Sequence, residues 1–113
     1  MMNTFEQREQ GFEAKFHHDL DLGFRVIVRR DKLLGLWAAE KMNMPAPAAA
    51  AYAAELVNTD CGPHRDDCVY TKVLSDLHRH GVEMSDHRLR RRMAILKDEA
   101  RRQVMVEENA PIM

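Results

Sequence analysis

Long apolar runs, aromatic side chains, glycine and cysteine are all scarce in this chain of 113 residues. No window approaches the run of about 18 apolar residues that spans a membrane, and the N-terminus lacks the basic and then apolar pattern of a signal peptide. Aromatic residues make up only 6% of the chain, beside five glycines and four prolines, which disfavours a β-sandwich. We therefore expect a cytoplasmic protein made of helices, with no direct membrane insertion.

Cysteine occurs twice, at Cys61 and Cys68, which is too few for a disulfide framework. In a reducing cytoplasm both thiols are expected to remain free. With His64 between them they could supply three of the four ligands of a zinc site. The fourth would have to come from one of three later histidines, His78, His80 or His87. Nothing in the sequence orients any of these, so we expect a reduced loop and no metal.

Apolar residues make up 45% of the chain, and their spacing predicts four bundle helices. The predicted ranges are 22–44, 47–59, 66–80 and 86–108. Pro45 and Pro47 separate the first two helices, and the second is rich in alanine, which allows close helix approach. Val26-Ile27-Val28 would also suit a short strand, but three residues weigh less than the long helical register. The predicted fold is an all-α four-helix bundle over residues 21–109, with a tail at 110–113.

The core of this bundle is expected on the apolar faces of its helices. The first helix carries the only tryptophan, Trp37, on a wide apolar face, and we expect the other helices to pack against it. The residues predicted for the core are Leu33, Leu34, Trp37, Tyr52, Leu89, Met93 and Leu96.

The formal net charge of −1 hides basic helices beside an acidic N-terminus. Residues 1–20 carry a charge of −2, whereas residues 23–41 carry +3 and residues 85–102 carry +4. No aromatic residue is interleaved with the arginines of the last helix, so we expect a solvated basic face or an anion site there rather than nucleic-acid binding. No phosphate-binding loop, nucleophile elbow or H-E-x-x-H motif is present, so an enzyme is not expected.

The first 20 residues carry a stripe of phenylalanines whose role the pattern leaves open. At 100° per residue, Phe5, Phe12 and Phe16 fall on one narrow stripe, with Leu20 a little further round. Such a stripe is more often core than binding surface. It is narrower than the faces of the bundle helices, however, and those helices form a four-helix set without it. The pattern is therefore compatible with both a core helix and a binding arm.

The limits of this N-terminal segment follow from its local sequence. Thr4 and Gln7 have the spacing of a capping box, so a helix is expected to begin there. Residues 17–23 lack a periodic apolar face and end in glycine, which indicates a hinge or a weak helix joint. Because so short a helix is marginal alone, we expect residues 1–20 to be a mobile arm, disordered or marginally helical when free.

Four strings of residues are similar to one known family. They are Phe5-x-x-Arg8-Glu9-x-x-Phe12-Glu13-Ala14-Lys15-Phe16, Arg29-Arg30-x-Lys32-Leu33-Leu34-Gly35-Leu36-Trp37-Ala38-Ala39-Glu40-Lys41, Ala51-Tyr52-Ala53 and Ser85-Asp86-His87-x-Leu89-Arg90-Arg91. With them, most of the chain resembles the zeta inhibitor subunit of alphaproteobacterial F-type ATP synthases. The loop from Cys61 to Cys68 departs from the family, in which this loop is usually acidic.

The resemblance implies a non-enzymatic protein inhibitor of ATP hydrolysis. A mobile N-terminal segment, here residues 3–19, would become helical on inserting into the ATP synthase head, formed by the alpha, beta and gamma subunits, and would block rotation in the hydrolysing direction. Its apolar anchors would be Phe5, Phe12 and Phe16. Its polar contacts would be Arg8, Glu9, Glu13 and Lys15.

The same resemblance implies a peripheral location on the inner membrane, through ATP synthase. It also implies that the bundle can bind an adenine nucleotide, although no cofactor is required. This leaves an alternative function, an adenine-nucleotide or anion-binding sensor without strong inhibitory activity. In that alternative the phenylalanine stripe would be ordinary core.

Overall fold

The computed structural model describes residues 4–109, and the side chains of residues 20–109. It contains four α-helices and a short 3-10 helix, and no strand occurs in the described part of the chain. In chain order they are α1 (Thr4–Lys41), α2 (Ala46–Val57), η1 (Gly62–His64), α3 (Arg65–Arg79) and α4 (Asp86–Glu108). The predicted all-α class is therefore confirmed, and the three β-branched residues that could have formed a strand lie within α1.

Helix α1 is a single helix of 38 residues, which differs from the predicted break at residues 17–23. Its described part starts at Thr4. The helix continues through Gly23 because one glycine disfavours a helix by only about 1 kcal/mol and no proline occurs before Pro45. It ends earlier than predicted, since Asn43 adopts a left-handed φ of 58°. The mobility of the segment before Leu20 stays a prediction.

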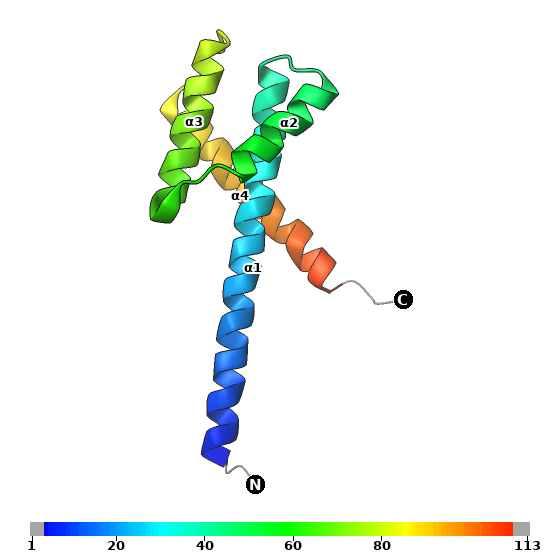
Figure 1. The fold of residues 1–113 in the computed structure, drawn as a ribbon, viewed down its shortest axis with the longest axis vertical. Coiled ribbons are helices and arrows are strands. Elements are labelled where there is room, and N and C mark those ends of the chain that lie inside the picture. Colours follow the sequence, from blue (N-terminus) through cyan, green and yellow to red (C-terminus); the bar gives the residue numbers. More distant parts are fainter. Residues whose placement is uncertain (1–3, 110–113) are drawn as a thin grey trace.

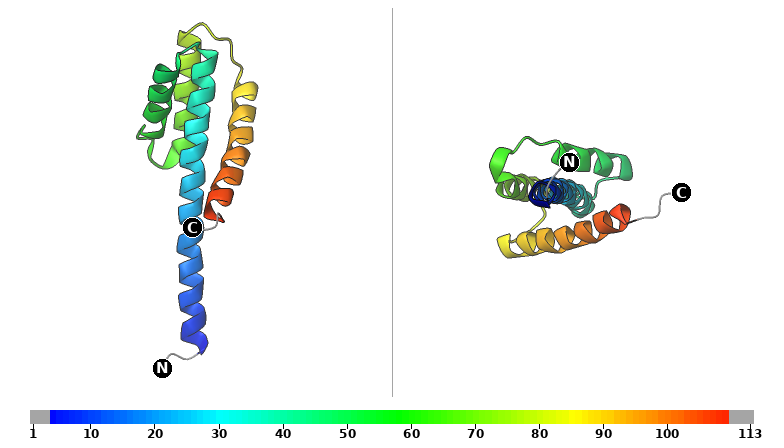
Figure 2. Two further views of the ribbon diagram at one scale, coloured as in Figure 1. Left: turned by 90° about the vertical axis from the view of Figure 1, so that its right-hand side faces the viewer. Right: turned by 90° about the horizontal axis from the view of Figure 1, so that it is seen from below.

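The other helices surround only the C-terminal half of α1 (Figure 1). Helices α2 and α4 lie on opposite sides of it, and α3 lies beside its end (Figure 2). The N-terminal half extends past all three. The bundle thus holds one end of a long helix and leaves the other end without neighbours in the described part of the chain.

Two clusters of buried apolar residues hold the bundle together. The larger joins all four helices through fully buried residues such as Leu34, Leu56 and Leu89. The smaller joins α1 to α4 through Val26 and Val104. Of the residues predicted for the core, Leu34, Tyr52, Leu89 and Met93 are buried, whereas Leu33, Trp37 and Leu96 are partly buried at the edges of these clusters.

Helices α1 and α2 approach each other most closely at Gly35. A β-carbon at position 35 would lie 2.6 Å from the Cα atom of Ala53 and 3.1 Å from its Cβ atom. Ala53 is itself only 2% exposed, so the contact is sealed from solvent. The alanine-rich sequence of α2 therefore has the packing role predicted for it, and its partner on α1 is a glycine.

The prediction of two free thiols is wrong, because Cys61 and Cys68 form a disulfide. The turn of η1 brings their Cα atoms to 5.6 Å, within the range that a disulfide requires. Both sulfur atoms are thereby occupied, so the zinc pattern considered for the sequence is not assembled. His64 is exposed at the end of η1.

Reduction of this disulfide should lower the free energy of unfolding by about 2 kcal/mol, because the bond closes a short loop in the unfolded chain. Urea unfolding with and without a thiol reductant measures the difference. The Cys61→Ser, Cys68→Ser double variant is the control and should show the lower stability in both conditions. An unchanged urea midpoint on reduction of the native protein would contradict the disulfide.

Candidate functional site

The residues predicted to make the inhibitory contacts all fall in the first half of α1. They are Phe5, Arg8, Glu9, Phe12, Glu13, Lys15 and Phe16. Their side chains lie outside the described residues, so their contacts stay predictions. The backbone places this segment on the part of α1 that extends past the bundle (Figure 1).

Two large apolar side chains follow this segment directly and face solvent. Leu20 is 57% exposed and Phe24 is 68% exposed. They are four residues apart, so they are neighbours on one face of α1. Both line an open groove of about 770 Å³.

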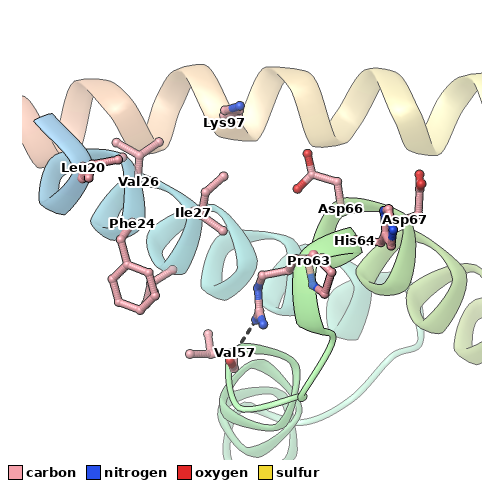
Figure 3. Close-up of a pocket in the computed structure, with 13 residues that line it drawn as sticks. Leu20, Phe24, Val26, Ile27, Val57, Pro63, His64, Asp66, Asp67 and Lys97 are labelled. Carbon is pink, nitrogen blue, oxygen red and sulfur yellow. Dashed lines mark hydrogen bonds between the residues drawn. The ribbon is translucent and has the colours of Figure 1, made fainter.

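The opposite wall of this groove comes from the connection between α2 and α3. Val57 at the end of α2 and Pro63 in η1 line it, while Lys97 reaches it from α4 (Figure 3). Asp66 and Asp67 stand at the rim and form ion pairs with Arg30 and Arg90, respectively. The groove therefore has an apolar floor, and the two aspartates at its rim are already paired.

A buried ion network lies behind this wall. Asp31 is fully buried and Arg30 is 2% exposed, although both are charged. Arg30 donates to Asp31 Oδ1 through Nε at 2.9 Å and to Asp66 Oδ1 through Nη2 at 2.9 Å. Arg65 donates to the other oxygen of Asp31 through Nε at 2.8 Å. The carboxylate of Asp31 thus binds guanidinium groups from two elements.

Arg65 also closes the C-terminal end of α2. Its Nη1 donates to the carbonyl of Thr59 at 2.9 Å and its Nη2 to the carbonyl of Val57 at 2.9 Å. These carbonyls have no partner within the helix, so the guanidinium satisfies them. The loop that carries Pro63 is therefore fixed to α1 by Arg65 and Asp31, and to α3 by the disulfide.

Sequence reasoning missed this network, although a signal was present. At 100° per residue, Arg30 and Asp31 lie on the same face of α1 as Leu34, which was predicted for the core and is fully buried. Two charged residues on a core-facing stripe indicate a buried pair with further partners. The partner Arg65 could not be found, because it lies 34 residues further along the chain, at the start of α3.

A second ion network joins α2 to α3. Tyr52 donates its hydroxyl to Asp76 Oδ2 at 2.7 Å, and Arg79 and Lys72 also contact this carboxylate. Burial acts to raise the pKa of Asp76, but hydrogen bonds from Tyr52, Arg79 and Lys72 outweigh it and lower the pKa below its usual value. Asp76 therefore stays charged, and the network is a structural tie between helices.

A smaller hollow of about 230 Å³ lies between α1 and α4 beside Trp37. The guanidinium carbon of Arg92 lies 5.5 Å from the centroid of the indole ring, and Lys41 Nζ lies 5.9 Å from it. Arg88 and Arg91 also line it, together with Met84 and Ile95. Within the described residues none of these three arginines pairs with a carboxylate, so the hollow is strongly basic.

Together these features define a class of protein, a small helical bundle that presents one long helix beyond its core. Residues 2–103 match the family model described as ATPase inhibitor subunit zeta, and the chain belongs to that family. The resemblance read from the sequence is confirmed. A search of curated proteins gives no match. Within the described residues, no helix is long and apolar enough to cross a membrane.

Membership in this family implies a general role for the chain. An inhibitor subunit acts by binding, so the family supports a protein that inhibits an ATPase and does not itself hydrolyse substrate. It also implies association with ATP synthase. In the described fold, the N-terminal half of α1 extends past the other helices (Figure 1).

Proposed function

We propose that this protein inhibits ATP hydrolysis by F-type ATP synthase, inserting residues 3–19 at a catalytic interface of the head formed by the alpha, beta and gamma subunits. The observation that carries the proposal is α1 itself, which extends past the bundle in a protein of the inhibitor family. An inserted helix with Phe5, Phe12 and Phe16 on one stripe fits helix-in-groove recognition. Once inserted, it blocks rotation in the hydrolysing direction.

The continuity of α1 supports this mechanism in a second way. Because no break separates the inserted segment from the bundle, the segment is presented as an extension of a packed helix. A helix that is already anchored at one end loses less conformational freedom on binding than a free peptide does. The bundle is also wider than one helix, so it limits how far α1 can enter.

Deletion of residues 1–19 should abolish inhibition of ATP hydrolysis by isolated ATP synthase heads, because it removes the inserted segment and leaves the bundle intact. Phe12→Ala should weaken inhibition and leave the thermal unfolding temperature nearly unchanged. Hydrolysis is measured as inorganic phosphate release at increasing inhibitor concentration. Equal inhibition by the full chain and the truncated chain would contradict the proposal, as would a large stability loss for Phe12→Ala.

A second candidate function is adenine-nucleotide or anion binding at the basic hollow beside Trp37. The observation that favours it is the set of arginines around the only tryptophan, none of which pairs with a carboxylate among the described residues. Guanidinium groups bind phosphate and stack with aromatic rings. In this proposal the base stacks near Trp37 and the phosphates bind Arg88 and Arg91. No bound cofactor is needed for inhibition itself.

Titration with ADP should quench the fluorescence of Trp37 to saturation, because the base would lie against the indole. Arg92→Gln should weaken this binding, whereas Arg102→Gln, a change on an exposed arginine of the same helix that lies outside the hollow, should not. Inorganic phosphate alone tests whether the hollow selects a nucleotide or any anion. Fluorescence unaffected by millimolar ADP would exclude this candidate.

A further inference from the structure

We infer that the partner-binding surface continues beyond residue 19. Leu20, Phe24 and the groove beside them would then form a second contact, with an apolar segment at the surface of the ATP synthase head. This inference rests on the proposed function and assigns a role to a region outside the predicted inhibitory segment. Three observations support it: the direction in which side chains point along α1, the exposure of Leu20 and Phe24, and the fixed position of the groove wall that faces them.

The helical phase shows that a single face of α1 runs from the phenylalanine stripe into the bundle. At 100° per residue, Leu20 lies about 40° from Phe16 and Ile27 about 20° from it, while Leu34 returns to the same direction. The bundle covers this face completely at Leu34, which is fully buried. At Leu20 the bundle leaves the face exposed. The groove lies at the point along α1 where the other helices stop covering this face.

Exposure at this place is concentrated rather than scattered. Single exposed apolar side chains are normal on protein surfaces, but contiguous ones that line a hollow mark interaction sites. Leu20 and Phe24 are adjacent on the helix, face solvent and line the same groove. Figure 3 shows Leu20 beside Val26 at one end of the groove, Phe24 and Ile27 also on α1, and Val57 and Pro63 on the facing elements. A partner segment placed there would contact α1 and the bundle together.

The facing wall is held in place by the disulfide and by ion pairs. Pro63 lies in η1, between the two cysteines of the disulfide, and the adjacent Arg65 is bound to buried Asp31. Asp66 at the rim is held by Arg30. A wall fixed in this way needs little ordering when a partner binds, which favours recognition.

The geometry of a continuous helix also identifies the occupant. A helix rises about 1.5 Å per residue, so Phe24 lies about 7.5 Å along the axis from residue 19. If the segment up to residue 19 is inserted in the head, Leu20 must stand at the mouth of the insertion site and Phe24 about one turn outside it. The surface that meets them is therefore the rim of that site on the enzyme. A second copy of this chain is the competing occupant.

The test compares full-length variants in the ATP hydrolysis assay. The Leu20→Ala, Phe24→Ala double variant should raise the concentration for half-maximal inhibition about tenfold, as loss of anchor residues does at interfaces, and still reach full inhibition at saturation. Val106→Ala is the matched control, because Val106 is 70% exposed on α4 and does not line this groove. It should inhibit like the unchanged protein. Phe24→Leu should retain most of the affinity, because it keeps an apolar side chain.

The outcomes separate this inference from the function on which it rests. Full-strength inhibition by the double variant would overturn the second contact and leave the inserted segment standing. Failure of the unchanged protein to inhibit would overturn both. Circular dichroism should show the same helix content and unfolding temperature in all variants, since the substituted side chains are exposed. Sedimentation that shows a dimer dissociated by the double variant would assign the surface to self-association instead and overturn the inference.

Discussion

Replacement of Asp31 by alanine should lower the free energy of unfolding by about 3–5 kcal/mol, the largest effect expected for any single substitution considered. The change removes the carboxylate that accepts from Arg30 and Arg65 and leaves the guanidinium of Arg30, only 2% exposed, with Asp66 as its remaining anion. A buried charge that loses its partner is strongly destabilising, whereas the intact pair contributes much less. Urea unfolding measured at neutral pH gives the difference.

The control for this prediction is Asp98→Ala on α4. Asp98 also pairs with an arginine, Arg101, but the pair is exposed, so its loss should change the stability by less than about 0.5 kcal/mol. Asp31→Asn provides an intermediate test, because the amide keeps the volume and some acceptor capacity but loses the charge. If Asp31→Ala were as mild as Asp98→Ala, the burial of Arg30 and Asp31 in one network would be wrong.

Gly35→Ala should lower the free energy of unfolding by about 3 kcal/mol, even though alanine is the better helix former. The new β-carbon would lie 2.6 Å from the Cα atom of Ala53. Because that Cα atom belongs to the backbone and cannot rotate away as a side chain can, α1 and α2 must separate. That separation opens the core beside Leu34 and Leu56. Urea unfolding again measures the effect.

The matched control is Gly23→Ala on the same helix, for which the expected change in stability has the opposite sign. Gly23 has nothing within 4 Å of the position where a β-carbon would be added. Gly23→Ala should therefore raise the stability of α1 by up to about 1 kcal/mol through helix propensity alone. Destabilisation by both variants would contradict the close approach at Gly35, because it would show that a general property of α1 is responsible.

The limits of α2, α3 and α4 could be predicted closely because their signals are local, whereas α1 begins 18 residues earlier than predicted. Pro45 and Gly81 interrupt the apolar periodicity, and Ser85 caps α4 through a hydrogen bond from the backbone amide of Arg88. The family could likewise be read from the residues around Trp37. These features need only sequence neighbours, so no knowledge of the tertiary fold is required.

The features that could not be predicted depend on contacts between distant residues. The disulfide requires η1 to turn Cys61 toward Cys68, and the network of Asp31 requires Arg65 from the far side of a loop. Trp37 was predicted for the core but is only partly buried, whereas Leu34 is fully buried and Gly35 makes the close contact with α2. The indole consequently lies at an edge, where it meets arginines of α4.

The unbroken course of α1 through Gly23 has a consequence for how the protein can vary. A continuous helix fixes the angle about its axis between side chains at its two ends. One residue inserted between Leu20 and Val26 would turn the phenylalanine stripe by about 100° relative to the bundle, whereas an insertion of seven would restore it to within about 20°. The number of residues between Leu20 and Val26 can therefore change only by amounts close to whole helical turns. This constraint holds even if none of these residues contacts the enzyme.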